Sequence, residues 1–104
     1  MGHPRPRPRR LAEKLRQIRN AFGVSQTDWH RRLGVEHLIA YNEISKYESG
    51  NREPPLMVLL QYARVAGVHM EALVDDELDL TDKLPGDVKH EDIKRKYASR
   101  RFRN

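Results

Sequence analysis

The sequence contains no cysteine among its 104 residues. Disulfide bonds and thiolate metal ligands are therefore excluded, which fits a cytoplasmic protein. No apolar run reaches the length of about 20 residues that a membrane-spanning helix needs, and no signal-peptide-like apolar stretch is present. Alternation of apolar and polar residues, the pattern of a half-buried strand, is also missing. These absences leave a soluble, cytoplasmic, all-α protein as the expectation.

The motifs of the common enzyme and metal sites are missing as well. The five histidines, at positions 3, 30, 37, 69 and 90, form no His-x-x-x-His or His-Glu-x-x-His pattern. The glycines form no phosphate-binding loop, and no serine lies in a Gly-x-Ser-x-Gly turn. We therefore expect no enzymatic activity, no metal site and no cofactor.

Acidic residues are scarce at both ends of the chain. Residues 1–10 carry four arginines and no acid, and residues 83–104 carry eight Lys/Arg against three Asp/Glu. Residues 11–82 carry eight Lys/Arg against twelve Asp/Glu, so the middle is acidic. Two basic ends on an acidic body indicate a polyanionic partner, although solubilising tails would have the same composition.

Apolar residues at helical spacing predict the first two helices. One face of the first helix, which stops at Gly23, carries four of them: Leu11, Leu15, Ile18 and Phe22. Ser25 with Asp28 three residues on resembles a capping box that starts a second helix. This helix should end at Gly34, and its side chains Trp29 and Leu33 should face the core.

Three further helices are expected downstream. The third must contain Ile44 and Tyr47 and stop at Gly50. Pro55 marks the first turn of the fourth, which ends near Gly67. Its predicted buried residues are Leu56, Leu59, Leu60 and Ala63. A short fifth helix has Met70, Leu73 and Val74 as its apolar residues, and Leu78 and Leu80 could pack back on the body.

The chain therefore divides into three predicted parts. Residues 1–8 form a flexible arm of alternating Pro and Arg, because proline removes a backbone donor and favours extended backbone. Residues 9–80 form the five-helix domain. Residues 81–104 form a basic tail, within which Ile93 and Tyr97 are spaced for a short helix.

Three strings in this order carry a resemblance: GVSQTDWHRRLG, ISKYESGNREP and PPLMVLLQYARVAGV. Together they resemble the helix-turn-helix domain of the XRE-like regulators, the phage-repressor and Cro type, over about residues 9–77. The resemblance implies an all-α, five-helix repressor-type domain. It also implies a transcriptional regulator that binds double-stranded DNA sequence-specifically, as a dimeric repressor. The homodimer surface it suggests runs from Met70 to Leu80.

The resemblance also implies where the DNA backbone would be contacted. Gln26 would reach a phosphate at the start of the second helix, beside Thr27, because helix N-termini attract anions. Asn51 and Arg52 stand where members of the family touch the next phosphates. Glu48 and Arg52, four residues apart near a helix end, are expected to form a structural ion pair in the free protein.

One departure from the family pattern lies between the second and third helices. Nine residues, Val35 to Glu43, separate Gly34 from Ile44, where the family usually has about five. The excess is close to one helical turn of ~3.6 residues. It would either lengthen the recognition helix or enlarge the turn into a loop. We favour the loop, with the helix starting near Asn42, because a longer helix would expose Leu38 and Ile39 together.

A second departure is His30, where the family generally has alanine because two helices cross closely. The histidine and the inserted residues are expected to compensate each other and to give a more open crossing. The residues expected to meet bases are Tyr41, Asn42, Glu43, Ser45 and Lys46, since Asn pairs with adenine, Ser with several bases and Lys with guanine. A solvated helix face is the alternative for each of them.

Other functions remain open at this point. The same fold serves as an antitoxin-like interaction module, whose C-terminal tail would bind a partner protein. An RNA-binding adaptor would use the two basic ends. The Pro/Arg arm could also lie along the DNA minor groove, whose negative potential attracts arginine.

Overall fold

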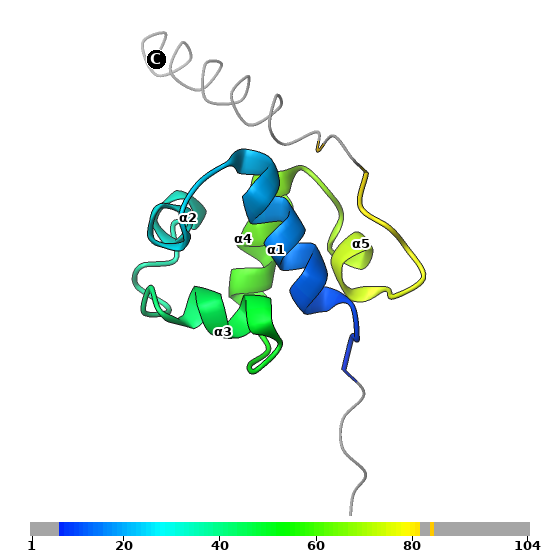
Figure 1. Ribbon diagram of the computed structural model, residues 1–104, viewed down its shortest axis with the longest axis horizontal. Coiled ribbons are helices and arrows are strands. Elements are labelled where there is room, and N and C mark those ends of the chain that lie inside the picture. Colours follow the sequence, from blue (N-terminus) through cyan, green and yellow to red (C-terminus); the bar gives the residue numbers. More distant parts are fainter. Residues whose placement is uncertain (1–6, 82–83, 85–104) are drawn as a thin grey trace, which may run out of the picture.

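The computed structural model describes residues 7–81 and residue 84, and these residues fold into five α-helices without a strand (Figure 1). The helices are α1 Leu11–Phe22, α2 Gln26–Leu33, α3 Glu43–Ser49, α4 Leu56–Ala66 and α5 Met70–Val74. The all-α, five-helix prediction is confirmed. No helix in the described part combines the length and apolar character needed to cross a membrane. The predicted tail helix at Ile93 and Tyr97 lies outside the described residues.

The central helix, α1, forms as its apolar spacing predicts. Leu11, Leu15 and Ile18 are buried, and Phe22 packs at the edge of the core. In Figure 1, α1 runs in front of α4, with α2 and α5 on opposite sides and α3 below, and α1 contacts α3, α4 and α5. This helix therefore connects α3 to α4 and α5.

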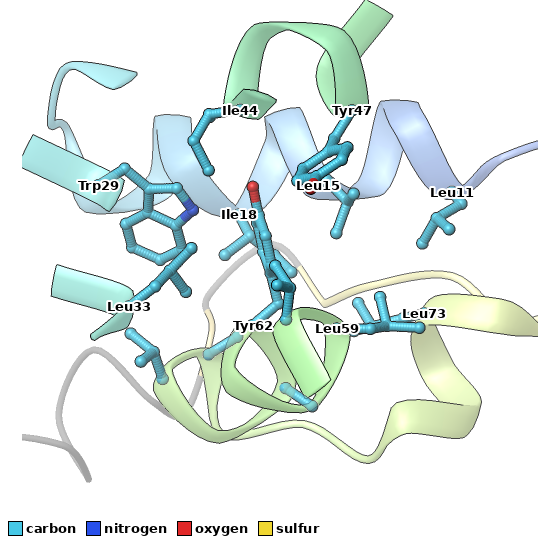
Figure 2. Close-up of a cluster of buried hydrophobic side chains, with 14 of the residues drawn as sticks. Leu11, Leu15, Ile18, Trp29, Leu33, Ile44, Tyr47, Leu59, Tyr62 and Leu73 are labelled. Atoms are coloured by element: carbon cyan, nitrogen blue, oxygen red, sulfur yellow. The ribbon is translucent and has the colours of Figure 1, made fainter. Parts of the chain in front are cut away.

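An aromatic cluster fills the space between α1, α2 and α4. The Trp29 ring contacts Phe22 at 5.3 Å and Tyr62 edge-on at 5.6 Å between centroids. Figure 2 shows the indole of Trp29 facing Tyr62, beneath Ile44. Burial raises the pKa of Tyr62. Such edge-on aromatic pairs contribute about 0.5–1.5 kcal/mol beyond the area they bury.

The inward face of α4 differs in part from the one predicted. Leu59 and Ala63 are buried, Leu60 is half-buried, and Leu56 is 70% exposed, so the prediction for Leu56 was wrong. Leu56 is the first residue of α4, and a helical side chain points back over the preceding turn, here beyond the packed body. The buried face instead includes residues that the prediction omitted: Val58, Tyr62, Val65 and Ala66.

Two polar side chains tie the start of α1 to the end of α5. The Asp76 carboxylate accepts hydrogen bonds from the backbone amides of Arg9 and Arg10, at 2.9 and 3.0 Å. Lys14 is buried, and its Nζ donates to the carbonyls of Ala72 and Asp75 at 2.8 and 2.7 Å. Asp76 thus satisfies free amides at one helix start, and Lys14 satisfies carbonyls at one helix end.

The Asp76 contact predicts a loss of stability in acid. The hydrogen bonds from the amides of Arg9 and Arg10 lower the pKa of Asp76 below its ordinary value of 3.8. A carboxylate with a lowered folded-state pKa stabilises the fold fully above that ordinary value, and the contribution disappears as pH falls through the lowered one. Urea unfolding between pH 7 and pH 2 should show a smaller acid-induced loss for Asp76→Asn than for the wild type. The exposed neighbour Glu77→Gln is the control, and an unchanged pH profile in Asp76→Asn would contradict the expectation.

Candidate nucleic-acid interface

The second and third helices begin and end as local signals dictate. The Ser25 hydroxyl accepts a hydrogen bond from the Asp28 amide at 3.1 Å, which confirms the predicted cap of α2. Trp29 and Leu33 are buried, as predicted, and anchor α2. Ile44 and Tyr47 are buried and anchor α3, also as predicted. Gly50 ends α3 with φ +81°, a conformation that strains other residues, and the Cβ of Ala12 lies within 3.7 Å of where a Cβ would stand.

A buried ion pair holds α3 against α1. The carboxylate of Glu48 is held by two nitrogens of the Arg19 guanidinium, Nε at 2.6 Å and Nη2 at 2.9 Å. The two side chains are only 5% and 17% exposed, respectively. The hydrogen bonds that Arg19 donates to Glu48 raise the pKa of Arg19, so its guanidinium stays charged. Arg19 also donates to the carbonyl of Val24 at 2.8 Å, in the turn before α2.

The expected ion pair between Glu48 and Arg52 is absent, and the prediction was wrong. Because α3 ends at Ser49 and Gly50 is left-handed, Arg52 does not continue the helical spacing that would bring it beside Glu48. The Arg52 guanidinium instead reaches Glu43 at the start of α3, with 2.6 Å between Nη1 and Oε1.

Gln26 has a structural contact that the sequence did not indicate. Its side-chain amide donates to Oε1 of Glu48 at 3.2 Å, and the side chain is half-buried. Gln26 joins α2 to the pair of Glu48 and Arg19, so three helices meet at one carboxylate.

A second charged cluster lies on the outer side of α3. Glu43 accepts from Arg52 and lies 3.9 Å from Nζ of Lys46. The side chains of Arg52 and Lys46 are 56% and 42% exposed, whereas that of Glu43 is 17% exposed. Both cations therefore remain accessible to a large anion, while the acid between them is shielded.

The remaining candidates all lie at the surface of this region. Asn42 and Ser45 are exposed, and the Ser45 hydroxyl donates to the Asn42 carbonyl at 3.1 Å. Tyr41 is 60% exposed. Thr27 in α2 and Asn51 after α3 are exposed too. Most candidates therefore lie in α3 or directly beside it in the chain, whereas Thr27 lies on the surface of α2 and Gln26 is half-buried.

The inserted residues form a loop, and α3 starts at Glu43 after Asn42, so the favoured alternative is confirmed. Ile39 packs against the core, whereas Leu38 is 48% exposed. His30 is buried, with Nε2 at 2.7 Å from the carbonyl oxygen of Ile39. The two departures from the family pattern therefore touch each other, and the more open helix crossing stays a prediction.

A cavity of about 240 Å³ lies between the segment before α1 and the turn after α3. Its lining includes Arg7, Arg9 and Arg52, together with Tyr47 and Glu53. Nε of Arg7 lies 3.3 Å from Oε2 of Glu53. The cavity therefore adds basic side chains beside the end of α3. Among the described residues, no three His, Asp or Glu side chains are grouped to hold a metal ion.

In a comparison with protein families, residues 15–73 match the helix-turn-helix family model HTH_3. The match covers more than half of the chain, and it includes α1 from Leu15 onward, all of α2 to α4, and most of α5. The chain belongs to this XRE-type helix-turn-helix family, a family of DNA-binding regulatory domains. Comparisons with curated proteins and with solved structures gave no match.

Sequence reasoning missed Arg19, which holds Glu48. The available signal was its position directly after the buried Ile18, on the flank of the apolar face of α1. An arginine there can reach a neighbouring helix while its stem packs on apolar surface. The choice of partner, however, depends on where α3 crosses α1, which no local pattern gives.

Two substitutions in α3 should separate the buried ion pair from the exposed one. Glu48→Gln leaves the Arg19 charge buried without its carboxylate and should lower the free energy of unfolding by about 3 kcal/mol. Glu43→Gln removes a partner of the half-exposed Arg52 and should cost less than about 1 kcal/mol. Urea unfolding at pH 7 measures both. Equal losses in the two variants would show that Glu48 does not have the special role its burial indicates.

Proposed function

We propose that this protein is a sequence-specific, double-stranded DNA-binding regulator of transcription that acts as a dimeric repressor in the cytoplasm. The observation that carries the proposal is the polar outer face of α3, held in place by α1 and α2 in a helix-turn-helix domain. Asn42, Ser45 and Lys46 are available on this face. An α-helix fits the major groove, where each base pair presents its own pattern of donors and acceptors.

Base recognition would come from the N-terminal half of α3 and the residue before it. The side-chain amide of Asn42 suits adenine, and the ammonium of Lys46 suits guanine. The hydroxyl of Ser45 can form hydrogen bonds with several bases. Glu43 can accept a hydrogen bond from the amino group of cytosine only if its contact with Arg52 weakens, so the role of Glu43 depends on that arginine.

Phosphate contacts would come from side chains that already hold a carboxylate. Arg52 donates a hydrogen bond to Glu43, and Gln26 donates one to Glu48. A DNA phosphate offers each a further acceptor, and Thr27 adds a hydroxyl beside the first free amides of α2. Asn51 follows the end of α3 and would face the next phosphate. Arg7 and Arg9 extend this basic surface, which supports an arm that lies along the minor groove.

Dimer formation would place two copies of α3 about 34 Å apart, one turn of DNA. The segment from Met70 to Leu80 is the proposed surface, since Val74 and Leu78 are 40% and 39% exposed there. Leu80 and Leu73 point into the core and would not take part. A partner protein for the C-terminal tail would use residues outside the described part of the chain.

The first experiment is the selection of bound duplexes from a random DNA library, with the full chain at near-physiological salt. The proposal expects an enriched pseudo-palindrome, and its half-site spacing would give the dimer geometry. Salt-sensitive binding without enrichment would overturn sequence-specific regulation. The interaction-module function, with the tail bound to a partner protein, would then take its place.

Substitutions should separate phosphate contacts from base contacts once a site is known. Arg52→Gln should weaken binding to all duplexes about equally and reduce the slope of log affinity against log salt by about one. Asn42→Ala should cost about 1–3 kcal/mol on the selected site, relax the preference at one base pair and leave the salt slope unchanged. Fluorescence anisotropy titrations from 50 to 300 mM salt measure both. The assignment fails if Arg52→Gln changes the base preference or Asn42→Ala changes the salt slope.

A further inference from the structure

The inserted loop, residues 35–42, is built as two closed turns. The amides of Leu38 and Ile39 donate to the carbonyl of Val35 at 2.9 and 3.0 Å. The amides of Glu43 and Ile44 donate to the carbonyls of Ala40 and Tyr41 at 3.1 and 3.3 Å. The second turn runs directly into α3. The loop therefore has a defined backbone up to the start of the recognition helix.

Three contacts fasten this loop to the domain. Val35 is fully buried, and the side chain of Ile39 packs against the core. The carbonyl of Ile39 accepts from Nε2 of His30, which must carry a proton because a carbonyl only accepts. His30 lies in α2 and is itself buried. The histidine therefore connects α2 to the middle of the loop.

Two large apolar side chains of the loop are exposed. Leu38 is 48% exposed and Tyr41 is 60% exposed. Both residues precede Asn42, the residue before the N-terminus of α3. In the proposed function, this end of α3 enters the major groove. Because the backbone that carries them is already fastened, binding through these side chains would cost little backbone entropy.

We propose that the inserted loop is a second DNA-reading element, in which Leu38 and Tyr41 contact thymine methyl groups next to the bases read by α3. His30 is the positioning residue that holds the loop for this contact. The inference rests on the proposed function and adds to it a preference for thymine at defined positions of each half-site. Thymine is the only base that presents a methyl group in the major groove.

DNA is the occupant that this surface fits. Tyr41 directly precedes Asn42, and Leu38 lies four residues before Asn42 in the same fastened loop, so a duplex in contact with Asn42 and Ser45 would lie near both side chains. A stable protein interface buries about 800 Å² on each partner, far more than two side chains provide. Single methyl groups, in contrast, need only one or two apolar neighbours.

The test replaces thymines of the selected site, one at a time, by deoxyuridine, which removes only the methyl group. The wild-type protein should lose about three- to fivefold in affinity at one or more thymines of each half-site, the loss that corresponds to one buried methyl group. In Leu38→Ala or Tyr41→Ala, the same replacement should have little effect. Leu56→Ala, which truncates an exposed leucine of α4, is the matched control and should keep the wild-type sensitivity.

Variants of His30 test its positioning role. His30→Ala should abolish the sensitivity to thymine methyl groups and leave the salt slope unchanged. His30→Gln, whose amide nitrogen can donate in place of Nε2, should restore the sensitivity. If His30→Ala only lowers the free energy of unfolding and keeps the preference for thymine over deoxyuridine, the positioning role is overturned.

Failure of the inference is distinct from failure of the proposed function. A selection that enriches no sequence overturns both. An enriched sequence whose thymines all tolerate deoxyuridine, or one without thymine at a fixed position, leaves the regulator proposal intact and overturns the role of the loop. Equal loss of sensitivity in Leu56→Ala would also overturn it, since the effect would then not belong to the loop.

Discussion

The candidate interface depends on the hydrogen bonds and the ion pair that the Glu48 carboxylate forms. This carboxylate lies in α3, it is held by Arg19 of α1, and it accepts from Gln26 of α2. A buried carboxylate is costly unless cations and donors surround it, so the three helices can approach only in an arrangement that brings these partners together. The apolar residues beneath them bring the helices together, and this network fixes how α2 and α3 lie relative to each other.

Paired acids explain how an acidic body can present a surface for DNA. Glu48 is neutralised by Arg19, and Glu43 by Arg52 with Lys46 nearby. Asp76 and Asp79, in contrast, bind the residues at the start of α1, where Arg10 reaches Asp79 and the pKa of Arg10 is raised by that hydrogen bond. Much of the negative charge is therefore either compensated or placed at the α5 end of the domain, away from α2 and α3 (Figure 1).

The extra residues between α2 and α3 are accommodated without moving the recognition helix out of register. Ile44 and Tyr47 still face the core, because the chain uses the added length in two turns before Asn42. A longer helix would have left Ile39 exposed together with Leu38. As a loop, the same residues bury Ile39 and give the buried His30 ring a carbonyl to bind.

The sequence by itself determined what depends on residues within about one helical turn: the five helices, the Ser25 cap, the glycine ends and most of the buried face of α1. Those features follow from backbone geometry and apolar spacing, which are local. Only the tertiary structure decided the partners of long polar side chains, such as Glu48 with Arg19 instead of Arg52, and Gln26 with Glu48. A flexible charged side chain binds whichever group the packed helices bring within reach, and that distance is set by contacts between elements far apart in the chain.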